Sequence, residues 1–170
     1  NAMQMSLGLG ASTTLLDVNN ELLNNIKSQY PAVNVAESSE TVIKNLLPMI
    51  DIVVGAVLTP GGKPPTVITR DMLSLMEPKS ILSDVSVDQG GCFETSKPTT
   101  HGDPTYEVDN IIHYCVKNIP SAVPYTATNA LNEATKLFIL KFANSGLHGL
   151  FNDNKLLMAL NTFKGKLTNH

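Results

Sequence analysis

Cysteine is scarce in this 170-residue sequence, and its two copies, Cys92 and Cys115, lie far apart along the chain. Two thiols are too few and too distant for a disulfide framework or a zinc site, so they predict reduced thiols in a cytoplasmic protein. No apolar run approaches the roughly 20 residues that a membrane helix requires, so no membrane association is expected. No basic leader followed by an apolar stretch opens the chain, so nothing predicts secretion.

An excess of basic residues is also lacking. The net charge is −3 and the isoelectric point is near 5.7. A surface that binds nucleic acid requires a basic face, so no nucleic-acid partner is expected. No spacing of His, Cys, Asp or Glu suits a metal ion, so no metal site is predicted. The length fits one domain that buries a substantial core.

Short apolar, β-branched runs alternate with helical stretches through the first two thirds of the chain. Strands are predicted over residues 12–18, 33–36, 50–58, 80–87 and 111–116. Helices are predicted over 20–29, 40–47 and 70–76, with Ser39 and Thr69 as N-caps of the second and third. Strand and helix in repeated alternation predict parallel β-α-β units, and therefore an α/β fold.

The C-terminal third has a different pattern. Residues 128–144 read as one helix, and the run 137–140 is apolar on every side, which predicts a buried helix. Gly146 follows as a helix stop signal. A shorter helix is predicted over 153–160, with Asn152 or Asp153 as its cap.

Ligands of an open parallel sheet bind beyond the carboxyl ends of its strands, and this rule selects two acidic residues. Asp17 ends the first predicted strand, where a carboxylate accepts hydrogen bonds from an adenosine ribose and repels a 2′-phosphate. The alternative is that Asp17 caps the next helix. Asp88 follows the fourth strand and precedes Gly90 and Gly91. It either reaches a ligand or serves turn chemistry.

Other polar residues favour structural roles. Asp84 within its strand is predicted to bond neighbouring backbone, and His113 alternates with apolar neighbours as a packing residue. The glycine fingerprint G-x-G-x-x-G of dinucleotide-binding turns is missing. Gly8 and Gly10 stand before a strand rather than after one, so they are predicted to end a helix and form a tight turn.

One segment carries a dense family pattern, DVSVDQGGCFETSKPTTHGDPT at residues 84–105. It resembles the signature of the alanine dehydrogenase/transhydrogenase alpha-subunit family. The segments GAVLTPGGKPPTVITRDML, HYCVKNIPSAVPYTATNAL and NTFKGKL are similar to the same family, in its C-terminal portion. The PTTHGDP and KGKLT segments favour alanine dehydrogenase over transhydrogenase.

This resemblance implies a Rossmann-like parallel sheet with flanking helices, followed by C-terminal helices. It implies NAD as cofactor, L-alanine and pyruvate as substrates, and a homo-oligomer, which is a hexamer in the family. Asp88 would be the active-site aspartate. The residues implied at the cofactor are Asp17, Ser38, Ala56, Val57, Leu58, Val87, Asn118, Ile119 and Pro120. Residues 1–126 would be a partial NAD-binding domain, and residues 127–170 a helical segment that packs back toward the substrate domain.

The sequence departs from the family pattern in three places. Ile119 stands where the family usually has Met, and Leu22 stands where many members have Lys or Arg. The chain also begins inside the first Rossmann helix, so the first strand and its glycine loop are not in it. In the strand order 3-2-1-4-5-6 that strand is central, and the sheet is expected to be interrupted there.

Two interpretations of the interrupted domain remain open. The chain is either a C-terminal part of an alanine dehydrogenase, inactive alone, or a truncated, non-catalytic remnant that serves as an oligomerisation or nucleotide-binding module. The opening Asn1-Ala2 is either a tag remnant or native. Weak or absent NAD binding is expected of this chain alone, because the phosphate-binding loop and its helix N-terminus are not in it.

Overall fold

The computed structural model describes residues 1–168 and divides the chain into two compact units, Asn1–Ile119 and Pro120–His170. The functional division at residue 126 remains a prediction from the sequence.

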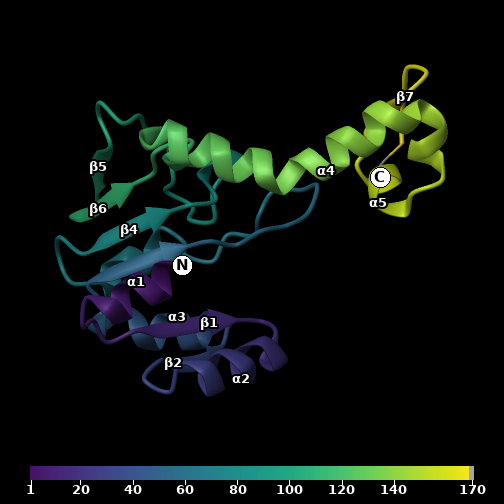
Figure 1. Cartoon of the computed structure of the whole chain (residues 1–170). Helices are drawn as coiled ribbons and strands as arrows, with labels where there is room; N and C mark the ends of the chain where they lie inside the picture. The colour runs from purple at the N-terminus through teal and green to yellow at the C-terminus, as the bar shows by residue number, and fades with distance from the viewer. Residues whose placement is uncertain (169–170) are drawn as a thin grey trace. The chain divides into compact units, whose positions relative to one another are not determined.

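The first unit is an α/β structure whose strands are divided between two separate sheets (Figure 1). Strand β1 (Thr14–Asp17) runs parallel to β2 (Asn34–Glu37) and is joined to it by helix α2 (Asn20–Gln29). A second sheet has the order β3-β4-β6-β5, in which the first three strands are parallel. Its strands are β3 (Ile52–Gly55), β4 (Ile81–Asp84), β5 (Thr105–Val108) and β6 (Ile111–Tyr114). The predicted α/β class with a mainly parallel sheet is confirmed.

Strands β1 and β3 belong to different sheets in the described part of the chain. The sequence predicts an interruption at this point of the sheet, and the observed pairing agrees with it. Helix α1 (Ala2–Gly8) precedes β1, and helix α3 (Glu40–Leu46) precedes β3. The Ser39 side chain accepts a hydrogen bond from the N–H of Val42, so the predicted N-cap of α3 is confirmed.

Two local predictions are wrong. The segment predicted as a helix over 70–76 is a 3-10 helix at Asp71–Leu75, whose N-cap is Arg70 and not Thr69. The N–H of Arg70 donates to the Glu94 carboxylate at 2.8 Å, so a residue from 24 positions away satisfies this end of the helix. Strand β5 was not among the predicted strands. It forms a hairpin with β6.

The turn of that hairpin explains how β5 forms. Asp109 and Asn110 lie between the two strands, and both have positive φ, 51° and 65°. A two-residue turn with this left-handed geometry favours Asp, Asn and Gly, and its twist matches the twist of the flanking strands. The Asp-Asn pair was therefore a signal in the sequence that could have identified the hairpin.

The core of the first unit includes residues of its larger sheet, such as Leu82 on β4 and Ile111 on β6. It is a cluster of buried residues made of Leu47, Ile68, Met72, Leu73, Met76, Leu82, Cys92, Phe93 and Ile111. Gly55 at the end of β3 packs directly on this cluster. A Cβ atom there would lie 2.5 Å from Cζ of Phe93 and closer still to Sγ of Cys92. The strand end therefore requires glycine for close packing, not for a special backbone angle.

The second unit is built on helix α4 (Pro124–Phe151), which is interrupted at Gly146 by a non-helical backbone with φ of 55°. Helix α5 (Asn154–Met158) follows, and Asp153 caps it as predicted, accepting from the N–H groups of Lys155 and Leu156. A short hairpin of β7 (Thr162–Phe163) and β8 (Lys166–Leu167) completes the described residues.

The prediction that the helix over 128–144 is buried is wrong for this unit. Leu137 is 76 % exposed and Ile139 is 59 % exposed. The physical reason is length. A 28-residue helix extends about 42 Å, whereas its packing partner α5 has five residues. An apolar run on every side of a helix is buried only where other elements surround it.

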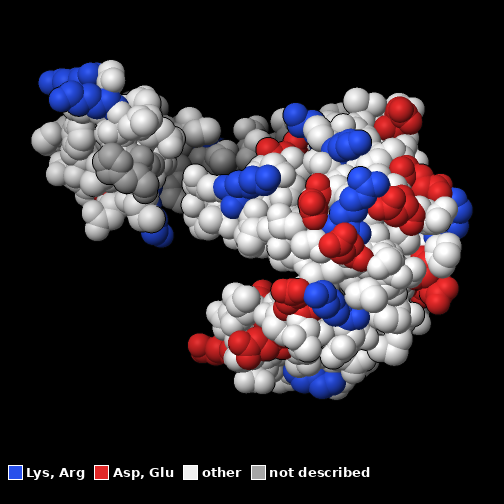
Figure 2. Space-filling view, turned by 180° about the vertical axis from the view of Figure 1, so that it is seen from behind, with Lys and Arg blue, Asp and Glu red and all other residues white. Residues whose placement is uncertain are grey.

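Two features of the surface bear on partners. Among the described residues no helix is both long and apolar enough to cross a bilayer. On the face drawn in Figure 2, Lys and Arg side chains are interspersed with Asp and Glu side chains. The whole sequence has 12 basic and 15 acidic side chains, which gives the net charge of −3.

Candidate functional site

Three loops leave the carboxyl ends of β3, β4 and β6 at one edge of the larger sheet. The register pairs Gly55 with Asp84, and Ser83 with Tyr114, so the three strands end at neighbouring positions. Parallel strands with adjacent ends bring their following loops together. Most of the residues predicted to contact a cofactor lie on these loops.

The loops after β3 and β4 are joined by hydrogen bonds. The N–H of Val85 donates to the carbonyl of Gly55 at 2.8 Å, and the Ser86 hydroxyl donates to the carbonyl of Val57 at 2.7 Å. Ser86 was not predicted as a site residue. Ala56 and Leu58, on either side of Val57, are exposed. Val87, which follows Ser86, is buried.

Asp88 and Asn118 come together from the loops after β4 and β6. The N–H of Asn118 donates to Oδ2 of Asp88 at 3.0 Å, and Asn118 adopts a positive φ of 50°. The turn around Asp88 is closed by backbone alone, because the N–H groups of Gln89 and Gly90 donate to the carbonyls of Ser86 and Val87. The Asp88 carboxylate therefore contacts a distant loop and takes no part in closing its own turn.

Asp17 and Ser38 form a second group, at the ends of β1 and β2. The N–H of Ser38 donates to the backbone carbonyl of Asp17 at 2.9 Å. The Asp17 side chain accepts from the N–H of Asn19 at 2.8 Å through Oδ1. Asn19 is the N-cap of α2, accepting from Leu22, so the alternative reading of Asp17 as that cap is wrong.

The chemistry available to Asp17 follows from these contacts. Within residues 1–168 the Asp17 carboxylate accepts its hydrogen bond through Oδ1, which leaves Oδ2 as an acceptor at a strand end. An acceptor-only carboxylate in this position suits a ribose diol. In the described chain no hydrogen bond joins this group to the one around Asp88. Ile119 closes the first unit and is half-buried, and Pro120 begins the second.

Asp84, at the end of β4, is fully buried and bonds neighbouring backbone, as the sequence predicts. Its two oxygens accept from the N–H groups of Ser86 and Cys92, each at 2.9 Å, and from the Ser96 hydroxyl. Burial, and after it the nearby Asp84 charge, raises the pKa of the Cys92 thiol to about 12. Cys92 is therefore a protonated thiol at neutral pH, and both cysteines are buried and free, in agreement with the predicted reduced thiols.

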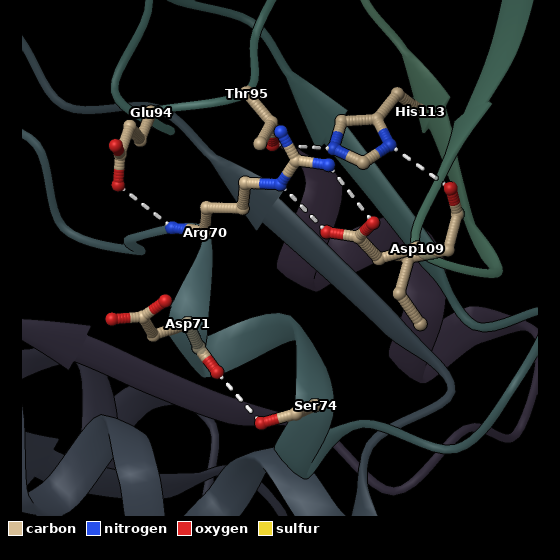
Figure 3. A network of polar contacts seen from close by, with 8 residues as sticks. Arg70, Asp71, Ser74, Glu94, Thr95, Asp109 and His113 are labelled. Atoms are coloured by element: carbon tan, nitrogen blue, oxygen red, sulfur yellow. Dashed lines mark hydrogen bonds and ion pairs between the residues drawn. The ribbon is translucent and has the colours of Figure 1, made fainter.

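His113 is also buried, on the strand β6, in agreement with its predicted packing role. Figure 3 shows its polar contacts together with the nearby Arg70–Asp109 ion pair. A carbonyl only accepts, so His113 Nδ1 donates to Ile111 at 3.0 Å, and Nε2 accepts from the Thr95 hydroxyl at 2.7 Å. Burial lowers the pKa of His113, which stays a neutral ring between these two partners.

The family described as "Alanine dehydrogenase/PNT, C-terminal domain" matches residues 1–170. The chain belongs to this alanine dehydrogenase/PNT family. Membership confirms the resemblance that the sequence shows at residues 84–105 and in the segments before and after them.

Individual members of the alanine dehydrogenase/PNT family agree. The chain is 46 % identical to an alanine dehydrogenase of Halomonas elongata and 44 % identical to alanine dehydrogenase 2 of Staphylococcus aureus strain USA300. Each comparison covers 99 % of this chain and 46 % of the relative. The chain thus spans about half the length of the curated relatives it matches.

Solved structures of related proteins agree on the fold. An L-alanine dehydrogenase structure superposes with a TM-score of 0.88 at 40 % identity, over 99 % of this chain and 47 % of the other. A transhydrogenase from Sinorhizobium meliloti superposes with a TM-score of 0.73 at 21 % identity, over 99 % of this chain and 45 % of the other, which shows the shared fold alone. The Rossmann-like fold expected from the sequence is therefore confirmed.

Proposed function

We propose that the protein carrying this sequence is an NAD-dependent alanine dehydrogenase, and that this chain supplies its nucleotide-binding half. The reaction oxidises L-alanine with NAD and water to pyruvate, ammonia and NADH, and runs in reverse. The observation that carries the proposal is the 46 % identity to an alanine dehydrogenase across 99 % of the chain. The hydrogen bond between Asp88 and Asn118 supports it from the geometry.

The proposed roles follow the two groups at the strand ends. Asp17 accepts hydrogen bonds from the adenosine ribose, and Ser38 lies beside it. Repulsion between the Asp17 carboxylate and a 2′-phosphate then favours NAD over NADP. The residues on the adenosine and pyrophosphate side are Ala56, Val57 and Leu58.

The reacting end of the site is assigned to the loops after β4 and β6. Val87, Asn118 and Ile119 would flank the nicotinamide, and Asp88 would face the substrate. Pro120 begins the second unit, and its place at the cofactor stays a prediction from the sequence. Bound NAD supplies the hydride acceptor, and the protein holds the reacting atoms in line. One Asp88 oxygen is engaged by the N–H of Asn118, so the other is available to accept from the ammonium group of alanine.

The residues of this chain fit one part of the cofactor better than another. The Asp17 carboxylate suits the ribose, but the turn after β1 carries Asn19 as helix cap where a phosphate-binding turn would require glycine. None of the described residues forms a glycine-rich strand-to-helix turn. The pyrophosphate is therefore not assigned to a backbone cradle in this chain.

Assembly into a homo-oligomer is part of the same proposal. It is supported by the exposed apolar side chains of α4, because large exposed apolar surfaces are usually covered by another protein surface. Analytical ultracentrifugation of the protein at its full natural length tests this part. A monomer at micromolar concentration would contradict it.

The activity is tested by NADH formation with the protein at its full natural length. We expect NAD reduction that depends on L-alanine, and NADH oxidation that depends on pyruvate and ammonium together. Replacement of NAD by NADP should reduce the rate. Hydride transfer between two nicotinamide nucleotides without any alanine dependence would overturn the proposal in favour of a transhydrogenase.

A further inference from the structure

We propose that Asp84 is a positioning residue for Asp88, because its one buried carboxylate fixes both ends of the loop that carries Asp88. The inference rests on the proposed function of Asp88. Asp84 makes no contact with a ligand in this proposal, and its effect passes through the loop that it holds.

The hydrogen bonds of Asp84 define this arrangement. Oδ1 accepts from the N–H of Ser86 at 2.9 Å, at the start of the loop. Oδ2 accepts from the N–H of Cys92 at 2.9 Å, at its end. Five residues, 87–91, lie between these two anchors, and Asp88 is the second of them. Asp84 thus fixes the separation of the loop ends from the side of the core, together with the backbone hydrogen bond from the N–H of Gly91 to the carbonyl of Ser86 at 3.1 Å.

Two further donors hold the carboxylate itself in place. The Ser96 hydroxyl donates to Oδ2, and the Cys92 thiol donates to Oδ1 at 3.4 Å. The loop also approaches this carboxylate closely at Gly91, whose φ is +76°. A Cβ atom at Gly91 would lie 3.0 Å from Oδ2 of Asp84. The loop therefore combines a left-handed residue with a close approach, and both features require glycine.

The loop held by Asp84 is connected to both neighbouring loops. On one side the Ser86 hydroxyl donates to the carbonyl of Val57 at 2.7 Å. On the other side Asp88 accepts from the N–H of Asn118 at 3.0 Å. If the ends of the loop separate, the carboxylate of Asp88 moves away from Asn118. The position of Asp88 is therefore set through Asp84, which is buried and contacts no ligand itself.

The charge and shape of Asp84 are both needed. Four donors converge on its two oxygens, and an ionised carboxylate only accepts. An asparagine at this place keeps the shape but carries an NH₂ group. That group faces the N–H of either Ser86 or Cys92, and two donors then oppose each other in a buried site. Asp84→Asn is consequently the variant that releases one end of the loop with the smallest change in volume.

The first experiment uses the amide proton of Asn118, measured by ¹H–¹⁵N NMR on the 170-residue chain. Asp88→Asn gives the chemical shift of this proton when its carboxylate partner is replaced. We expect Asp84→Asn to move the Asn118 signal toward that reference position. The control Ile111→Val perturbs the buried core of the same sheet and should leave the signal in place.

The outcomes are distinct. An Asn118 signal that stays at its wild-type position in a folded Asp84→Asn chain overturns the inference. A signal that moves equally in Ile111→Val also overturns it, because the effect would then be a general loss of packing. This readout needs neither NAD nor alanine, so it succeeds or fails independently of the proposed activity.

A second variant keeps the inference testable if Asp84→Asn does not fold. Ser96→Ala removes one donor to Oδ2 and leaves both backbone contacts of Asp84. We expect faster hydrogen exchange at the Cys92 amide, and no change at the Leu82 amide within the core strand. Unchanged exchange at Cys92, or an equal increase at Leu82, contradicts the inference.

Turnover by the protein at its full natural length completes the test. If Asp84 positions Asp88, Asp84→Asn lowers kcat by a larger factor than it raises the KM for NAD. A larger effect on KM than on kcat overturns the inference. A protein with no alanine-dependent activity refutes the proposed function, and the NMR result then still decides whether Asp84 sets the position of Asp88.

Discussion

The backbone N–H of Asn118 donates to the carboxylate of Asp88 across 30 positions of sequence, at 3.0 Å. This contact joins the loops after β4 and β6, two strands that are neighbours in the sheet. It gives the exposed Asp88 side chain a fixed direction at the edge where ligands of such sheets bind.

Asp88→Ala should lower kcat for alanine oxidation about 100-fold, the size typical for loss of one oriented polar group in an active site. The fold should be unaffected, because Asp88 is exposed. Steady-state kinetics at the full natural length measure the change. Glu77→Gln, an exposed carboxylate outside the site, is the matched control and should keep wild-type kcat. Equal kcat values in the two variants would refute the role of Asp88.

Asp17→Ala should weaken NAD binding by roughly 10- to 150-fold, since a hydrogen bond to a charged group contributes about 1.5–3 kcal/mol. The preference for NAD over NADP should decrease in parallel, because the charge that repels a 2′-phosphate is removed. Titration of both nucleotides at the full natural length tests this. Glu21→Gln, in the first turn of α2, is the control. An unchanged NAD-to-NADP ratio would show that Asp17 does not contact the ribose.

His113 should make the stability of the chain depend on pH. Burial lowers its pKa in the folded state, so the unfolded chain binds a proton more readily. Stability is therefore full above the unfolded pKa of about 6.5 and decreases as pH falls below it, by at most about 1.4 kcal/mol per pH unit. Urea unfolding between about pH 7.5 and pH 5.5 measures this loss.

His113→Gln removes the titrating group, so its unfolding free energy should fall less over the same interval. An identical slope for wild type and His113→Gln would assign the pH dependence to other groups.

Gly55→Ala should destabilise the chain by roughly 1–3 kcal/mol, the usual effect of overpacking a core. The added methyl group would meet the Phe93 ring and the Cys92 sulfur. Gly102→Ala is the control, because a Cβ atom there meets nothing closer than Oγ1 of Thr100 at 4.0 Å. Thermal unfolding should separate the two variants. Similar melting temperatures would mean that the strand end relaxes around the new methyl group.

The 170-residue chain by itself should produce no NADH from alanine and should bind NAD weakly. The turn after β1 lacks a glycine cradle, so no strand-to-helix turn of this chain offers backbone N–H groups to the pyrophosphate. An activity assay and titration calorimetry on the chain test both statements. Measurable turnover, or a micromolar dissociation constant, would contradict them.

The sequence by itself determined the features that depend on neighbouring residues. Helix α2 begins and ends where the pattern places it, Asn20–Gln29, and the caps at Ser39 and Asp153 are as predicted. Capping, turn geometry and hydrophobic period act over a few residues, so they can be read along the chain. The dense motif at residues 84–105 likewise identified the family, which the comparison over all 170 residues confirms.

Tertiary structure decided which distant groups meet. The Asp88–Asn118 contact and the position of Cys92 on Asp84 depend on which strands are neighbours and in what register. No local pattern contains that information. Asp88 and Asn118 could therefore be chosen as candidates from the sequence, but their contact could not be predicted. The exposure of α4 was misjudged for the same reason. An apolar run specifies that a surface prefers burial, whereas the elements packed around it decide whether burial occurs.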